Sequence, residues 1–174
     1  MAQVVFLRGV NVGGNKTFRP STLATELTDL DVVNVGAAGT FVVRSGISQS
    51  NLHTELAGRL PFQAEMMICR DREILDLAAE DPFPEEADDG LTRYVSVLAK
   101  RPATLPGLPL CRPEGDDWEV KVLCVPGRFV LSFHRRMGRN ILYPSQVVEK
   151  CFGVPSTTRN WNTIAAICKI LKGG

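Results

Sequence analysis

The sequence predicts an α+β protein whose N-terminal half is a ferredoxin-like βαββαβ unit. Three observations carry this prediction. Residues 3–70 alternate between β-branched runs and helical patterns in that order, each helical pattern has leucines on one face, and a smaller α+β half follows an acidic, proline-containing segment. A chain of 174 residues, 44% of them apolar, is long enough to bury roughly two-thirds of its unfolded surface.

The expected elements of the N-terminal half are a strand at 4–7, a helix opened by Pro20 and Ser21, strands at 32–35 and 40–43, a helix capped by Ser50 and stopped by Pro61, and a strand at 65–69. The middle strands are joined through the hairpin turn 36–39. The helices carry leucines at helical spacing: Leu23, Leu27 and Leu30 in the first, and Leu52, Leu56 and Leu60 in the second. We therefore expect an antiparallel sheet with both helices on one face.

A third helix, capped by Asp71, precedes the acidic segment 81–90, which contains two prolines and no periodicity. This segment is the best candidate for a connection. The expected organisation is therefore a ferredoxin-like half at 1–80, a connection at 81–90, and a second α+β half at 91–174 that packs on the first as one globular unit.

The second half is expected to contain three strands and two C-terminal helices. The strands are predicted at 93–98, 118–125 and 128–133, and the helices at 145–152 and 160–171. Four prolines between 102 and 113 predict an irregular loop there.

The composition argues against several classes of function. Twenty basic and nineteen acidic side chains give a net charge of +1, so nucleic-acid binding is unlikely, and the aromatic side chains that stack RNA bases on such sheets are missing. The five cysteines are scattered through mostly apolar runs, which is typical of a cytoplasmic protein, and no apolar run suits a signal peptide or a membrane span. With two histidines and no paired cysteines, we expect no metal and no cofactor.

The first candidate site is the glycine-rich loop after the first strand, and its candidate ligand-binding residues are Arg8, Asn11, Gly13, Gly14 and Lys16. Glycine amides beside two basic side chains could cradle a phosphate or carboxylate. The spacing fits neither a P-loop nor G-x-G-x-x-G. The structural alternative is a tight connection that requires positive φ at the glycines, with Asn11 bonded to its own backbone. Both interpretations stay open.

The second candidate site is the start of the last helix, where polar residues exceed the needs of one cap. Its candidate ligand-binding residues are Thr158, Arg159, Asn160 and Asn162. A helix N-terminus presents free N–H groups, to which Arg159 adds a bidentate fork for an anion. In the structural alternative Arg159 and Asn162 bond main-chain carbonyl groups while Trp161 packs as an anchor.

With both clusters in hand, the chain resembles the uncharacterised bacterial family catalogued as domain of unknown function 1697. The stretches that carry the resemblance are Phe6–Gly14, Asp81–Pro84 and Pro155–Thr163. The resemblance implies a ferredoxin-like arrangement with a second related half and no established activity. Ala38-Gly39-Thr40 stands where that family often has Ser-Gly-Asn, and Asn140-Ile141-Leu142 where it often has Ser-Lys-Leu. If those groups hold the common ligand, this member binds it weakly or binds another.

These observations favour a protein, with or without enzymatic activity, that holds a small anionic molecule between the loop 8–16 and the helix start 158–162. We therefore expect the two segments to meet in one concave site. The rival hypothesis is a non-enzymatic module that recognises RNA or a protein through its sheet or through the basic edge from His134 to Arg139. The sequence does not specify the ligand, the reaction or the oligomeric state.

Overall fold

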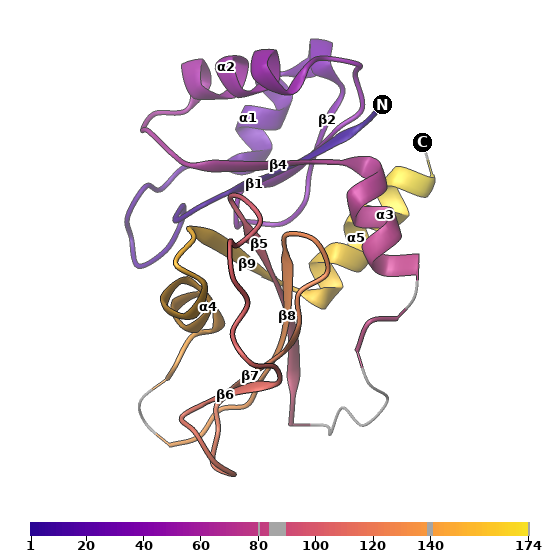
Figure 1. Ribbon diagram of the computed structural model, residues 1–174. Helices are drawn as coiled ribbons and strands as arrows, with labels where there is room; N and C mark the ends of the chain where they lie inside the picture. The colour runs from indigo at the N-terminus through magenta and orange to yellow at the C-terminus, as the bar shows by residue number, and fades with distance from the viewer. Residues whose placement is uncertain (80, 84–89, 139–140, 174) are drawn as a thin grey trace. The chain divides into compact units, whose positions relative to one another are not determined.

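The computed structural model describes residues 1–79, 81–83, 90–138 and 141–173, and it divides into two compact units (Figure 1). Unit 1 comprises Met1–Ala78 together with Ala165–Gly174, and unit 2 comprises Ala79–Ile164. The last helix, α5 (Trp161–Lys172), therefore contributes residues to both units. Most of the predicted connection at 81–90 lies outside the described residues, so the division at 1–80 and 91–174 stays a prediction.

Unit 1 contains the predicted ferredoxin-like arrangement. Its elements are β1 (Gln3–Leu7), α1 (Pro20–Glu26), β2 (Val32–Asn34), β3 (Thr40–Val43), α2 (Gln49–Arg59) and β4 (Met66–Arg70). The strands form an antiparallel sheet in the order β2-β3-β1-β4, which is the order of the split βαβ fold. The α+β class and the ferredoxin-like half are confirmed.

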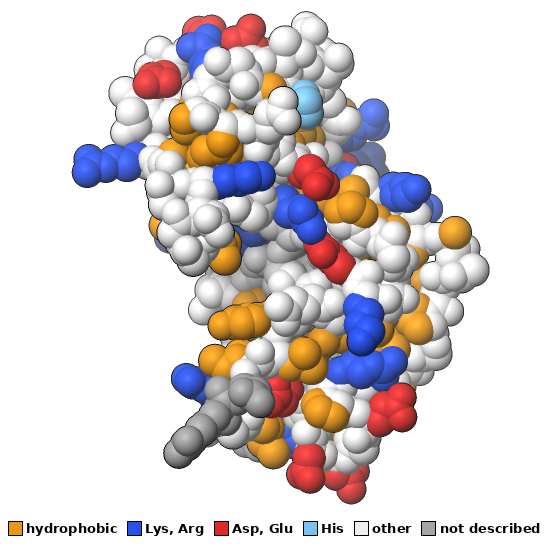
Figure 2. Space-filling model, turned by 90° about the vertical axis from the view of Figure 1, so that its left-hand side faces the viewer, with side chains coloured by type: hydrophobic (Ala, Val, Ile, Leu, Met, Phe, Trp, Pro, Cys, Tyr) orange, Lys and Arg blue, Asp and Glu red, His pale blue; other side chains and the backbone are white. Residues whose placement is uncertain are grey.

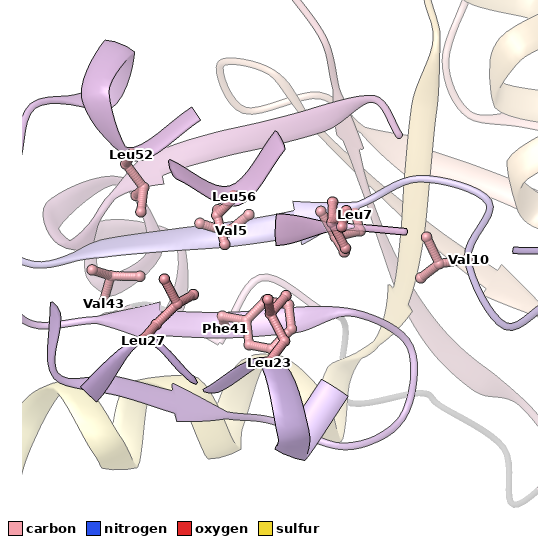
Figure 3. Packing of buried hydrophobic residues seen from close by; sticks show 10 residues of the cluster. Val5, Leu7, Val10, Leu23, Leu27, Phe41, Val43, Leu52 and Leu56 are labelled. Carbon is pink, nitrogen blue, oxygen red and sulfur yellow. The ribbon is translucent and has the colours of Figure 1, made fainter. Parts of the chain in front are cut away.

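The helices α1 and α2 cover the same face of this sheet (Figure 3). On that face the strands present the buried side chains Val5, Leu7, Phe41 and Val43. The helices and the residues that directly follow them contribute the predicted leucines Leu23, Leu27, Leu52, Leu56 and Leu60. The first leucine stripe is shared by two elements, because α1 ends before Leu27 and a 3-10 turn, η1 (Thr28–Leu30), carries Leu30. The expectation of an antiparallel sheet with helices on one face is confirmed.

The third predicted helix is α3 (Asp71–Ala79), which buries Ile74 and Leu77. Within unit 1 it touches the C-terminal part of α5, where the Sγ of Cys168 lies 4.0 Å from the carbonyl oxygen of Ile74. None of the helices in the described part of the chain combines the length and the apolar character that a membrane span requires.

The described residues of unit 2 form five strands where the sequence predicted three. They are β5 (Thr92–Leu98), β6 (Leu110–Arg112), β7 (Val120–Cys124), β8 (Phe129–His134) and β9 (Ser156–Asn160), and they form an antiparallel sheet in the order β6-β7-β8-β5-β9. The helix α4 (Pro144–Phe152) packs its valines against one face of this sheet. The unpredicted strands, β6 and β9, are the two edges.

Each edge strand lacked the pattern that predicts a strand. β6 has three residues between two prolines, inside the stretch expected to be an irregular loop. Proline is tolerated at sheet edges, where one side of the strand needs no backbone partner. β9 reads Ser-Thr-Thr-Arg-Asn and has no apolar alternation, yet its backbone pairs with β5 from Tyr94 to Leu98. Backbone pairing and two β-branched threonines are sufficient for a strand here.

Candidate anion-binding pocket

The loop after β1 closes on itself as a miniature hairpin. The N–H of Asn15 donates to the carbonyl of Val12 at 3.0 Å, and the N–H of Asn11 donates to the carbonyl of Lys16 at 3.2 Å. Gly13 and Gly14, at φ +57° and +78°, are the two central residues of this turn. A type I′ turn requires positive φ at both positions, so the turn itself accounts for both glycines.

The side-chain amide of Asn11 fixes this loop. Its Oδ1 accepts the N–H of Phe18 at 2.9 Å, and its Nδ2 donates to the carbonyl of Ala37 at 2.8 Å. Arg8 forms a 3.3 Å ion pair with Glu65 at the base of the loop. Lys16, like the two glycines, is exposed. Asn11 and Arg8 thus have structural partners. The remaining candidates, the two glycines and Lys16, lie in the exposed part of the loop.

The turn between β2 and β3 packs directly against this loop. The carbonyl of Gly39 accepts the N–H of Leu7 at 2.8 Å, and Gly39 has φ +77°. A Cβ at this position would lie 2.7 Å from Cγ2 of Val10 and 2.9 Å from Cβ of Leu7. The departure from the family pattern at 38–40 is therefore in contact with the loop. The second departure begins at residue 140, which lies outside the described residues.

The segment expected to be one polar helix start consists of a strand followed by a helix. Ser156–Asn160 forms β9, and α5 begins at Trp161. The expectation that Thr158 and Arg159 belong to a helix start is therefore wrong, because backbone pairing with β5 extends the chain up to Asn160. Successive residues of a strand point to opposite faces, so Arg159 is separated from Thr158 and Asn160.

Arg159 is a buried side chain within the sheet of unit 2. It is 7% exposed and lies opposite Val95, and its guanidinium donates to Oγ1 of Thr157 at 2.6 Å and to the carbonyl of Thr158 at 3.0 Å. Burial lowers the pKa of Arg159 to about 10, because the charged form loses hydration. On the other face, Oγ1 of Thr158 shares a 2.7 Å hydrogen bond with Oγ of Ser96.

Asn160 caps the start of α5. Its Oδ1 accepts the N–H of Thr163 at 3.0 Å and the hydroxyl of the same residue at 3.2 Å. Beside this cap lies an open pocket of about 330 Å³, which we call the α5 pocket. It is lined by Leu91, Thr92, Arg93, Asn160, Trp161 and Asn162, all in unit 2.

Arg93 is the charged residue of the α5 pocket that the sequence did not indicate. Its guanidinium lies 3.9 Å from a carboxylate oxygen of Asp81 and 5.5 Å from the centre of the Phe83 ring. Phe83 meets Trp161 edge-to-face at 5.2 Å, so aromatic rings support this side of the pocket. Arg93 reaches the start of α5 because β5 pairs with β9, and that pairing carried no sequence signal.

The predicted basic edge is partly engaged in structure. Arg135 stacks on the ring of Trp118 at 4.1 Å, donates Nε to the carbonyl of Trp118 at 2.6 Å, and donates also to the carbonyl of Asp116. Arg136 is exposed, and Arg139 lies outside the described residues. Figure 2 shows one face of the molecule, on which basic side chains are interspersed with acidic and hydrophobic ones.

Of the nine predicted site residues, the structure places Asn160 and Asn162 together in one pocket. Thr158 and Arg159 do not line it. The five residues of the loop, from Arg8 to Lys16, belong to unit 1, so a site shared with the start of α5 stays a prediction. The described residues bring together no group of three or more His, Cys, Asp or Glu side chains that could hold a metal ion.

Comparison with known proteins assigns the chain to a family without assigning it a function. The family described as "Protein of unknown function (DUF1697)" matches residues 1–122. The chain belongs to this family. A solved structure, that of the conserved bacterial protein SP0830 from Streptococcus pneumoniae, is similar at 18% sequence identity and a TM-score of 0.59, covering 98% of each chain. This likeness concerns the fold alone. No curated protein matches.

Proposed function

We propose that this member of the DUF1697 family binds a small anionic molecule in the α5 pocket. The observation that carries the proposal is the presence of Arg93, the amide side chains of Asn160 and Asn162, and the first turn of α5 around one open pocket. The predicted rival, RNA or protein recognition through the basic edge, is less well supported because Arg135 is engaged by Trp118.

The groups around the α5 pocket are suited to an anion. The first N–H groups of a helix lack intrahelical acceptors and carry partial positive charge. Arg93 adds a full charge, and its pairing with Asp81 across 3.9 Å is loose enough to be exchanged for a ligand. Because Oδ1 of Asn160 accepts from Thr163, the amide group of Asn160 retains its Nδ2 donors for a ligand.

The proposed setting is the cytoplasm. All five cysteines are free, and Cys69 and Cys168 are buried. Free, buried thiols are typical of a reducing compartment. The ligand is accordingly expected among the small phosphorylated or carboxylated compounds of the cell interior.

The test is a titration of the purified full chain with inorganic phosphate, sulfate and citrate, followed by ¹H–¹⁵N NMR and thermal unfolding. We expect saturable shifts for the amides of 91–93 and 160–162. A ligand present at roughly 100 times its Kd stabilises the folded state by about 2.7 kcal/mol. For a chain of this size that corresponds to an increase in Tm of about 5–10 °C.

Two variants separate the proposed pocket from the rival basic edge. R93Q removes the charge that lines the pocket, whereas R136Q removes an exposed charge from the basic edge. We expect R93Q to abolish the shifts and R136Q to leave them unchanged, with far-UV circular dichroism verifying that both variants fold. Loss of binding in R136Q alone, or no saturable shift with any anion, would refute the proposal.

The contribution of the loop in unit 1 requires its own variant. K16Q removes an exposed charge from the loop and retains the backbone carbonyl that accepts the N–H of Asn11. If the loop 8–16 takes part in the same site, K16Q weakens binding of the anion that R93Q abolishes. If K16Q binds like the parent, the predicted shared site is wrong and the α5 pocket acts alone.

A further inference from the structure

A second concave site lies in unit 1, where α2 begins above the edge of the sheet. This groove, which we call the α2 groove, has a volume of about 470 Å³. It is lined by Met1, Gln3, Gly46, Ile47, Ser48, Gln49 and Arg70. All seven residues belong to unit 1, so the groove is complete within one compact unit.

The register of the sheet places two of the polar side chains that line the α2 groove side by side. Gln3 of β1 lies directly opposite Arg70 of β4, and antiparallel partners point to the same face. Every second residue of a strand lies on the same face, so Gln3 shares a face with Val5 and Leu7, which pack against the helices. Gln3 and Arg70 therefore both project toward the layer that contains α2.

The side-chain amide of Gln3 is only half satisfied. Gln3 is 5% exposed, and its Nε2 donates to the carbonyl of Ile47. Since a carbonyl can only accept, this bond fixes which end of the amide carries oxygen. The buried Oε1 then has no donor among the described residues. A ligand with an N–H group in the groove would supply that donor.

The opposite wall of the groove suits a negative charge. α2 has eleven residues, and Oγ of Ser48 accepts the N–H of Asn51 at 3.2 Å. Capping satisfies one of the four N–H groups at a helix start and leaves others, such as that of Gln49, for an acceptor. The exposed guanidinium of Arg70 adds a full positive charge at the edge of the groove.

We propose that the α2 groove binds an apolar α-amino acid. Its carboxylate is held by the start of α2 and by Arg70, and its ammonium group donates to Oε1 of Gln3. The side chain of the ligand packs against Met1 and Ile47, which supply the apolar wall. An α-amino acid carries a hydrogen-bond donor and an anionic group on the same carbon atom, which suits a groove lined by both an acceptor and a cationic side chain.

The experiment titrates the full chain with L-leucine and with two compounds that each lack one of its charged groups. They are 4-methylpentanoate, which has no amino group, and 3-methylbutylamine, which has no carboxylate. We expect saturable NMR shifts with L-leucine at residues 46–49 and at the side-chain amide of Gln3. Each analogue is expected to bind about tenfold more weakly, a difference of about 1.4 kcal/mol.

Matched variants test the roles of the two walls. R70Q is expected to weaken L-leucine binding about tenfold, whereas R72Q, whose side chain is 85% exposed on α3 and does not line the groove, is expected to bind like the parent. Q3M removes the acceptor and is expected to bind L-leucine no better than 4-methylpentanoate.

Three outcomes would overturn the proposal: absence of saturable shifts at 46–49, equal binding of all three compounds by the parent, or equal losses of affinity in R70Q and R72Q. None of these outcomes depends on whether Q3M folds.

Discussion

Replacing Gly39 with alanine tests how tightly the β2–β3 turn is packed against the loop after β1. Gly39 has φ +77°, a backbone conformation that costs a residue with a Cβ about 1–2 kcal/mol. The new Cβ would also lie 2.7 Å from Cγ2 of Val10 and 2.9 Å from Cβ of Leu7. Carbon atoms in contact prefer about 3.5–4.0 Å.

The turn cannot easily move away to relieve this crowding. The carbonyl of Gly39 accepts the N–H of Leu7 at 2.8 Å, and Leu7 belongs to a strand that pairs with neighbours on both sides. The Cβ of Leu7 is attached directly to the backbone of this strand and cannot rotate out of the way. Forced overpacking of this kind costs about 1–3 kcal/mol. The total expected loss for G39A is therefore about 2–5 kcal/mol.

Gly36, at the other end of the same turn, provides the matched control. It has φ +75° and no atom within 4 Å of an added Cβ. We expect G36A to lose only the backbone term of about 1–2 kcal/mol. The measurement is urea unfolding of both variants, followed by far-UV circular dichroism and by amide exchange of β1 and β3. Equal losses in G39A and G36A would refute the close packing of turn and loop.

Three further predictions concern α5 and its surroundings. N160A removes the cap that accepts the N–H of Thr163, so urea unfolding is expected to show a loss of about 1 kcal/mol; an unchanged midpoint would show that the cap is dispensable. R159A removes a buried side chain and is expected to cost about 2 kcal/mol or more, whereas R159M keeps most of its volume and is expected to cost less; equal costs by the same assay would mean that packing is not the reason. Burial raises the pKa of the Cys168 thiol, so iodoacetamide at pH 8.5 is expected to modify it more slowly than an exposed peptide thiol, and mass spectrometry that finds equal rates would contradict this.

The fold of unit 1 could be predicted because its pattern is local. Leucines such as Leu52 and Leu56 recur at helical spacing, and strands such as β1 and β3 contain continuous runs of β-branched or aromatic residues. Such patterns are evident in windows of ten residues. The order of elements then leaves few topologies, and the split βαβ order is the one observed.

The edge strands of unit 2 could not be predicted in the same way. β9 contains no apolar residue, and its position is determined by backbone hydrogen bonds to β5, about sixty residues earlier in the chain. In the sequence, its run of polar residues directly before a helix is also the pattern expected of a helix N-terminus. Once the strand is recognised, alternation explains why Arg159 is buried while Asn160 is exposed.

The number of polar groups in a segment does not show which of them are available to a ligand. A sequence shows how many polar groups a segment carries but not which of them find partners. Asn11 is a candidate ligand-binding residue in the sequence, and in the structure its side-chain amide is bonded twice, to Phe18 and to Ala37. Gln3 lies in an otherwise apolar strand, where the sequence pattern indicates no ligand contact, and its Oε1 is one of the buried side-chain atoms that lack a hydrogen-bond partner among the described residues. Whether a polar group finds a partner depends on the register of the strands and on the way in which loops close. A candidate ligand-binding group can therefore be recognised only after the pairing of distant strands is known.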